Sequence, residues 1–251
     1  MQGEALAAQV DGNAGSPPVV MLHGFTQTAR CWGTFGADLR ADHRVVALDA
    51  PGHGNSSELR GDLWRTAGLA VAAGGTATYL GYSMGARIAL HAALAFPASV
   101  TRLVLISGTA GIDDPEERAA RRRSDESLAA RIGHIGVDAF LREWLAQPLF
   151  ADLSAQQHDL AERRRNRAEG LAASLRELGT GTQEPLWDRL GELAMPVLLI
   201  TGDADARYGH LARRAAEAIG PNATHVVLRG GHSVHRQAPD AAAVVRRWLR
   251  S

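Results

Sequence analysis

Short apolar runs that alternate with helical patterns constrain the fold of this sequence more than any other feature. Their length and their flanking glycines suit strands that are buried on both faces, which is typical of a parallel sheet. Strands that alternate with helices predict a doubly wound, mostly parallel α/β sheet with right-handed crossovers. The predicted strands are residues 19–22, 45–48, 77–80, 103–106, 197–200 and 226–228. The predicted helices are residues 28–39, 63–73, 84–95, 211–219 and 241–249.

The alternation stops between residues 111 and 187, where only helical patterns remain. Asp114 followed by Pro115 and Glu117 predicts one helix start, and Ser154 with Gln157 predicts another. The segment is too polar and too rich in arginine for a second hydrophobic core. We therefore expect one α/β core, formed by residues 1–110 and 188–251, and a helical cap over the active site, formed by residues 111–187.

Composition excludes several classes of function. The 27 basic and 27 acidic side chains cancel, so no global attraction to nucleic acid or to an anionic membrane is expected. All basic residues are arginine, and the absence of lysine excludes Schiff-base chemistry and Walker-type phosphate loops. No apolar run is long enough to span a membrane. Because Cys31 is the only cysteine and residues 1–4 do not resemble a signal peptide, we expect a cytoplasmic protein.

The segment Gly81-Tyr82-Ser83-Met84-Gly85 lies between a predicted strand and a predicted helix. In this context G-x-S-x-G indicates a tight turn that holds a nucleophilic serine at the positive end of the helix dipole. The alternative is an ordinary serine cap at the start of a helix. The strand before the motif and the helix after it favour Ser83 as a nucleophile.

A serine nucleophile needs a base and an acid, in the chain order Ser, Asp, His. His232 follows Gly230-Gly231 directly after a strand, whereas His225 lies inside that strand and His235 is expected at the pocket edge or on the surface. Two acids, Asp203 and Asp205, follow the strand before it. Asp205 lies further into the loop and is the predicted acid, and Asp203 is expected to fix the loop.

The turn His23-Gly24-Phe25 follows the first predicted strand, where this arrangement supplies one backbone N–H of an oxyanion hole. Phe25 and Met84 are therefore the predicted donors, and a plain glycine turn is the alternative. The spacing of His232 and His235 lacks the further ligands of a metal site. The glycine-rich loop at residues 49–54 opens no helix of the kind that binds dinucleotides. Neither a metal nor a cofactor is expected.

Arg87 lies one helical turn beyond Ser83, where its guanidinium could bind a substrate carboxylate. Further arginines cluster at residues 118–123 and 163–167. These clusters are equally consistent with solvated helix faces, on which Asp125 or Glu162 would pair with them.

Together these motifs resemble the 2-succinyl-6-hydroxy-2,4-cyclohexadiene-1-carboxylate synthases of menaquinone biosynthesis, within the α/β-hydrolase superfamily. The resemblance covers residues 17–251. It rests on residues 22–28, 49–57, 81–90, 147–150 and 179–183. The chain departs from the family pattern at Ala86, where glycine is usual, and at residues 205–208, where the acid is normally followed by a lysine and an aromatic residue.

The resemblance implies a cofactor-free lyase that eliminates pyruvate from a small polycarboxylate. It also implies a set of substrate-binding residues, although the run 163–165 leaves open whether Arg163 or Arg165 faces the pocket. These residues are Tyr82, Arg87, Arg121, Trp144 and Arg163. A serine esterase or carbon–carbon bond hydrolase with the same triad is the alternative, and a ligand receptor without catalytic activity is a further one. The sequence predicts no oligomeric state.

Overall fold

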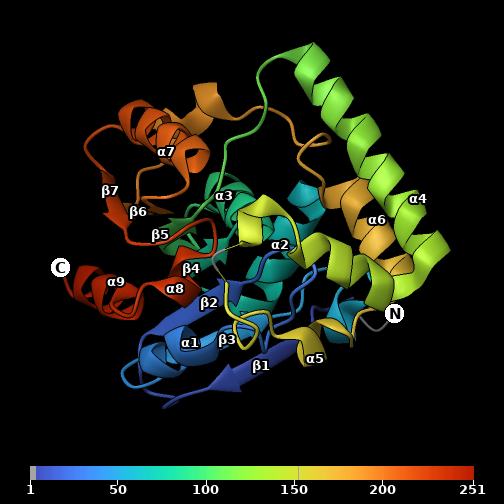
Figure 1. Ribbon diagram of the computed structural model, residues 1–251. Helices are drawn as coiled ribbons and strands as arrows, with labels where there is room; N and C mark the ends of the chain where they lie inside the picture. The colour runs from blue at the N-terminus through green and yellow to red at the C-terminus, as the bar shows by residue number, and fades with distance from the viewer. Residues whose placement is uncertain (1–3, 152) are drawn as a thin grey trace.

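The computed structural model describes residues 4–151 and 153–251, and its strands form a single sheet (Figure 1). The strand order is β1-β3-β2-β4-β5-β6-β7, and every neighbouring pair is parallel except β1 and β3. The predicted mostly parallel, doubly wound sheet is confirmed. The strands are β1 (Ala8–Asp11), β2 (Pro18–Leu22), β3 (Arg44–Leu48), β4 (Ala77–Tyr82), β5 (Val100–Ile106), β6 (Val197–Gly202) and β7 (Ala223–Leu228).

Strand β1 was not predicted from the sequence. It is short, lies at the sheet edge antiparallel to β3, and leaves Val10 50% exposed. Its residues alternate between exposed and half-buried positions, so it has no apolar run that would reveal it.

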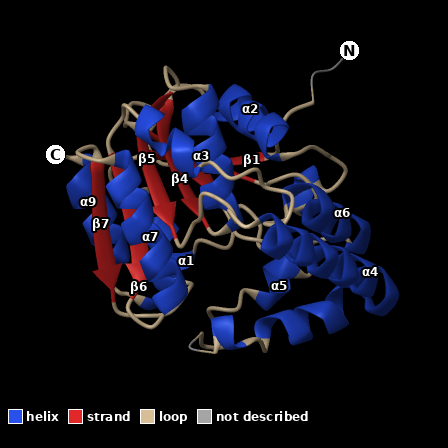
Figure 2. Cartoon of the chain, turned by 90° about the horizontal axis from the view of Figure 1, so that it is seen from above, coloured by secondary structure: helices blue, strands red, loops and turns tan. Residues whose placement is uncertain are grey.

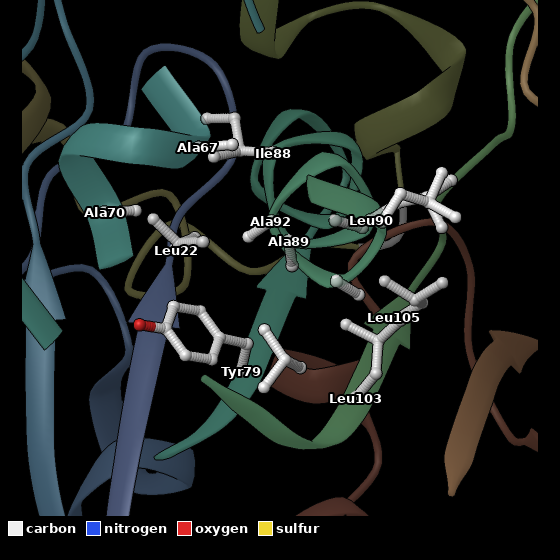
Figure 3. Packing of buried hydrophobic residues seen from close by; sticks show 14 of the residues in the cluster. Leu22, Ala67, Ala70, Tyr79, Ile88, Ala89, Leu90, Ala92, Leu103 and Leu105 are labelled. Atoms are coloured by element: carbon white, nitrogen blue, oxygen red, sulfur yellow. The ribbon is translucent and has the colours of Figure 1, made fainter. Parts of the chain in front are cut away.

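The sheet is buried on both faces. Along β2, Val20 and Leu22 pack into one hydrophobic cluster, while Val19 and Met21 pack into the other. The first cluster lies under α2 (Leu63–Gly74), α3 (Met84–Ala95) and α7 (Ala206–Ile219), and the second under α1 (Gly33–Leu39), α8 (Val234–Gln237) and α9 (Ala241–Leu249). Figure 3 shows Ala89 and Ala92 of α3 on the side of the helix toward the strands, and such small side chains let this helix approach the sheet closely.

Two helices begin at other residues than predicted. Helix α1 begins at Gly33, because residues 28–32 form turns closed by the Cys31 amide on the Thr28 carbonyl at 3.0 Å. Helix α7 begins at Ala206, well before the predicted residue 211, because Asp205 caps it by accepting a hydrogen bond from the Tyr208 amide at 3.2 Å.

The chain between β5 and β6 forms helices only, within the residues described. They are α4 (Pro115–Leu145), η2 (Pro148–Phe150), α5 (Leu160–Arg163), α6 (Ala168–Leu178) and η3 (Trp187–Glu192). Asp114 caps α4 as predicted, by accepting a hydrogen bond from the Glu117 amide at 2.8 Å. Figure 2 shows α4, α5 and α6 beyond the carboxyl ends of β4 and β5.

The helix predicted to start at Ser154 is absent from the described chain. Ser154 and Gln157 do exchange two hydrogen bonds, at 2.9 and 3.3 Å, but these close an isolated turn. Asp159, in the left-handed region with φ of 50°, interrupts the chain before α5 begins. The reciprocal side-chain pattern is therefore present without the helix that normally follows it.

Among the described residues, no helix has both the length and the apolar character needed to cross a bilayer. Met1, Gln2 and Gly3, on which the expected absence of a signal peptide partly rests, lie outside those residues. The cytoplasmic location stays a prediction.

Candidate active site

Ser83 occupies a sharp turn between β4 and α3. Its φ of 52° and ψ of −107° are unusual for a residue with a side chain, and such strain is typical of a serine displayed above a sheet. A side chain at Gly81 would collide with the backbone of Gly85, and one at Gly85 would collide with the Leu22 carbonyl. Both glycines are required for the close packing of strand and helix.

The imidazole of His232 lies between Ser83 and Asp205. Its Nε2 is 3.1 Å from Ser83 Oγ, and its Nδ1 is 2.9 Å from Asp205 Oδ2. Both His232 and Asp205 are buried. The arrangement can therefore move the serine proton onto an imidazole whose opposite nitrogen is held by a carboxylate.

The loop of His232 is fixed by contacts that the sequence did not reveal. Ser107 donates a hydrogen bond to the His232 carbonyl at 2.8 Å, and Gly231 donates one to Gln237 Oε1 at 2.7 Å. Ser107 lies 125 positions from His232 along the chain, so no local pattern indicates this contact.

The structure separates the two candidate acids. Asp203 is exposed and accepts a hydrogen bond from the Gly230 amide at 2.8 Å, which joins the loops after β6 and β7. Asp205 is the carboxylate that contacts His232. The role of Asp205 as the acid and that of Asp203 in fixing the loop stay predictions.

His235 is neither at the pocket edge nor on the surface, contrary to expectation. Helix α8 turns it inward, where its ring lies 4.3 Å from that of Tyr82 and 5.4 Å from that of Trp32. It is only 3% exposed, and burial holds its pKa well below the usual range. His235 is therefore a neutral part of the core.

Phe25 and Met84 line the same pocket as Ser83. Within the described chain, neither backbone N–H donates a hydrogen bond, so both are free to bind a ligand anion. The Phe25 turn is held by His53, whose Nε2 accepts from the Thr26 amide at 3.2 Å, and by Asn166, which donates to the Thr26 carbonyl at 2.7 Å. Sequence reasoning identified neither of these supports.

The pocket has a volume of about 350 Å³, and its walls come from two parts of the chain. The core supplies the floor, with Ser83, Asp205 and His232, and the segment between β5 and β6 supplies the roof. The side chains that the family resemblance implies for substrate binding all line it: Tyr82, Arg87, Arg121, Trp144 and Arg163.

Arg87 is buried in helix α3, and its Nη1 has no hydrogen-bond partner in the described structure. Burial lowers its pKa to about 10, so the guanidinium stays protonated at neutral pH. A buried cation without a partner is costly, and a ligand anion would compensate for it. Trp144 Nε1 is likewise buried without an acceptor among the described residues.

The two roof arginines, Arg121 and Arg163, already donate hydrogen bonds to other residues of the protein. Arg121 Nε donates to Asp125 Oδ1 at 2.8 Å. Arg163 is 2% exposed and donates to the His158 carbonyl at 2.7 Å and to the Thr26 hydroxyl, so it also supports the Phe25 turn. Arg163, not Arg165, faces the pocket, since Arg165 lies outside it at 3.6 Å from Glu162.

In residues 4–151 and 153–251, no three His, Cys, Asp or Glu side chains are grouped to hold a metal ion. The pocket contains a hydroxyl, an imidazole and a carboxylate connected in series, and arginine side chains line it beside them.

Comparison with known proteins agrees with this geometry. The sequence model of the Alpha/beta hydrolase family matches residues 19–245. A 2-succinyl-6-hydroxy-2,4-cyclohexadiene-1-carboxylate synthase from Salmonella newport is 32% identical over 93% of this chain and 93% of its own. A Bacillus subtilis protein whose name refers to the same synthase is 34% identical over 94% of this chain and 91% of its own. The structure of MenH from S. aureus matches with a TM-score of 0.88 at 26% identity and covers 97% of each chain.

Proposed function

We propose that this chain, which belongs to the alpha/beta hydrolase family and within it to the 2-succinyl-6-hydroxy-2,4-cyclohexadiene-1-carboxylate synthases, is a cofactor-free lyase of menaquinone biosynthesis. Its substrate would be 2-succinyl-5-enolpyruvyl-6-hydroxy-3-cyclohexene-1-carboxylate, from which it eliminates pyruvate. The observation that carries the proposal is one pocket that holds both a Ser83–His232–Asp205 relay and the buried Arg87, whose Nη1 has no hydrogen-bond partner among the described residues.

The relay supplies the base for the elimination. His232 takes the hydroxyl proton of Ser83 through Nε2, and the Asp205 carboxylate stabilises the imidazolium that forms. The Ser83 alkoxide then removes a proton from a ring carbon of the substrate. The electron pair of that bond moves into the ring, and the bond to the enolpyruvyl oxygen breaks. The enolate that leaves takes up the proton held by the His232 imidazolium and becomes pyruvate, which restores the neutral imidazole.

The free N–H groups of Phe25 and Met84 stabilise the negative charge near Ser83 during this step. The three carboxylates of the substrate are matched by Arg87, Arg121 and Arg163 in the same pocket. Neutral esters would gain little from this charge, which favours the lyase over a general hydrolase.

The segment of residues 111–187 would act as a cap in this reaction. Its side chains form the roof of the pocket, and Arg121 and Trp144 are among them. A cap of this kind excludes water from the reacting charges and strengthens the contacts to the carboxylates.

The same relay and free backbone amides also suit a serine esterase or a carbon–carbon bond hydrolase, which is the second candidate function. A ligand receptor without catalytic activity would have no use for an intact relay, so this candidate has the least support.

The deciding experiment incubates the purified protein with the enolpyruvyl substrate and measures pyruvate with a coupled dehydrogenase, against a control without protein. We expect one pyruvate for each substrate consumed. Cleavage of a neutral nitrophenyl ester without release of pyruvate would assign the hydrolase function instead. Absence of both activities would leave only a receptor.

A further inference from the structure

The imidazole of His232 lies close to two tyrosine rings. The ring centroid of Tyr208 is 4.4 Å from that of His232, and the centroid of Tyr82 is 5.5 Å away. Tyr82 is a fixed wall, because it is buried and its hydroxyl is 2.6 Å from Ser233 Oγ. Tyr208 extends from the first turn of α7 and is only partly buried.

Tyr208 and His232 are also connected through one carboxylate. Asp205 accepts the Tyr208 amide on Oδ1 at 3.2 Å and contacts His232 Nδ1 through Oδ2 at 2.9 Å. The cap of α7 therefore holds the backbone of Tyr208 next to the Asp205–His232 pair. With its centroid 4.4 Å away, the Tyr208 ring blocks movement of the His232 imidazole toward it.

The hydroxyl of Tyr208 is available to a ligand. Tyr208 and Tyr82 both line the pocket, but the Tyr82 hydroxyl is taken by Ser233, whereas that of Tyr208 has no hydrogen-bond partner in the described parts of the chain. Arg87, whose Nη1 has no hydrogen-bond partner among the described residues, lines the same pocket. A phenol donor and a guanidinium that line one pocket can bind the same carboxylate.

We propose that Tyr208 positions His232 with its ring and binds a carboxylate of the substrate with its hydroxyl, beside Arg87. The ring role concerns any reaction of Ser83, whereas the hydroxyl role rests on the proposed lyase function. The two roles are separable because the first requires only a flat aromatic face and the second requires only the oxygen.

Two substitutions separate them. Tyr208→Phe keeps the ring and removes the oxygen, so KM for the tricarboxylate should rise about tenfold with kcat within about twofold, and ester hydrolysis should be unaffected. Tyr208→Met keeps a helix-compatible side chain but removes the flat face, so kcat for a neutral ester should fall about tenfold at unchanged KM. Tyr79→Phe is the matched control, because its hydroxyl donates to the Gly75 carbonyl and Tyr79 does not line the pocket.

A third readout is the rate constant at which a fluorophosphonate labels Ser83. Because only folded molecules react, this rate constant can be measured even where part of a variant is unfolded. It should fall about tenfold in Tyr208→Met and stay unchanged in Tyr208→Phe and Tyr79→Phe. If Tyr208→Met were labelled and turned over the ester as fast as the wild-type protein, the positioning role would be overturned. A wild-type KM for the tricarboxylate in Tyr208→Phe would overturn the hydroxyl role. If the wild-type protein itself released no pyruvate, the lyase assignment would fail, and the labelling and ester assays would still decide the positioning role.

Discussion

The floor of the pocket rests on a sheet that is buried on both faces, whereas its roof rests on helices with a small hydrophobic cluster of their own. The cluster between α4 and α6 is small and contains residues such as Ile132, Phe140 and Leu171. The two clusters around the sheet are much larger. Exposed ion pairs such as Arg176–Glu126 join α6 to α4, and such pairs add little stability. Ser83, Asp205 and His232 belong to the part that rests on the sheet.

This difference indicates that the floor carries out proton transfer and the roof recognises the substrate. Proton transfer needs its groups held to within a fraction of an ångström, and loops anchored on packed strands provide that precision. Recognition of carboxylates tolerates more movement, and long arginine side chains on helices are suited to it. Substitutions in the floor should therefore affect every reaction of the protein, while those in the roof should affect the choice of substrate.

The largest effect is expected for Ser83→Ala, which removes the reacting oxygen at little cost in pocket volume. Turnover should fall about a millionfold for both the tricarboxylate and a neutral ester, while binding of the tricarboxylate in calorimetry stays near wild type. Ser127→Ala, at an exposed roof serine, is the control. Activity near wild type in Ser83→Ala would refute the mechanism.

The next largest effect separates the two acids of the floor. Asp205→Asn should lower kcat about ten-thousandfold in both assays, because the amide favours the wrong tautomer of His232. Asp203→Asn should stay within about tenfold of wild type, since Asp203 only accepts the Gly230 amide. The opposite ranking, in variants with unchanged circular dichroism, would assign the role of the acid to Asp203.

A smaller and more selective effect is expected for the arginines. Arg121→Ala in the roof, and Arg87→Ala beside the floor, should each lower kcat/KM for the tricarboxylate by about ten- to a hundredfold, which corresponds to one charge-assisted contact. Hydrolysis of a neutral ester should change little. Arg176→Ala is the matched roof control, because Arg176 pairs with Glu126 outside the pocket. Equal losses of both activities would refute the selective role of these arginines.

The smallest effect concerns the free energy of unfolding of the protein at acid pH. Burial lowers the pKa of His91 to about 4, while His91 in the unfolded chain keeps a pKa near 6.5. As pH falls from 6.5 toward 4, the unfolded state binds the proton first, so the free energy of unfolding decreases. His91→Gln should remove about 2 kcal/mol of this loss between pH 7 and pH 4.5, measured by urea denaturation. An unchanged pH dependence would show that other buried histidines account for the loss.

The contacts around His235 and Arg163 show where local sequence patterns stop being informative. His235 follows His232 by less than one helical turn, and only α8 decides that its ring packs against Trp32 and Tyr82. Arg163 and Arg165 are chemically identical neighbours. Their surroundings differ because Thr26, 137 positions earlier, accepts a hydrogen bond from Arg163.

By itself the sequence determined the alternation of strands and helices, the strand-to-helix turn at Ser83, and the order Ser83, Asp205, His232. These depend on apolar periodicity and on glycines beside the reactive residues, which are local properties. Only the tertiary structure decided which arginine faces the pocket, that Ser154 starts no helix, and that Tyr208 lies on His232. Each of these depends on contacts between segments far apart in the chain, and the packing of the whole fold selects among side chains that look alike in the sequence.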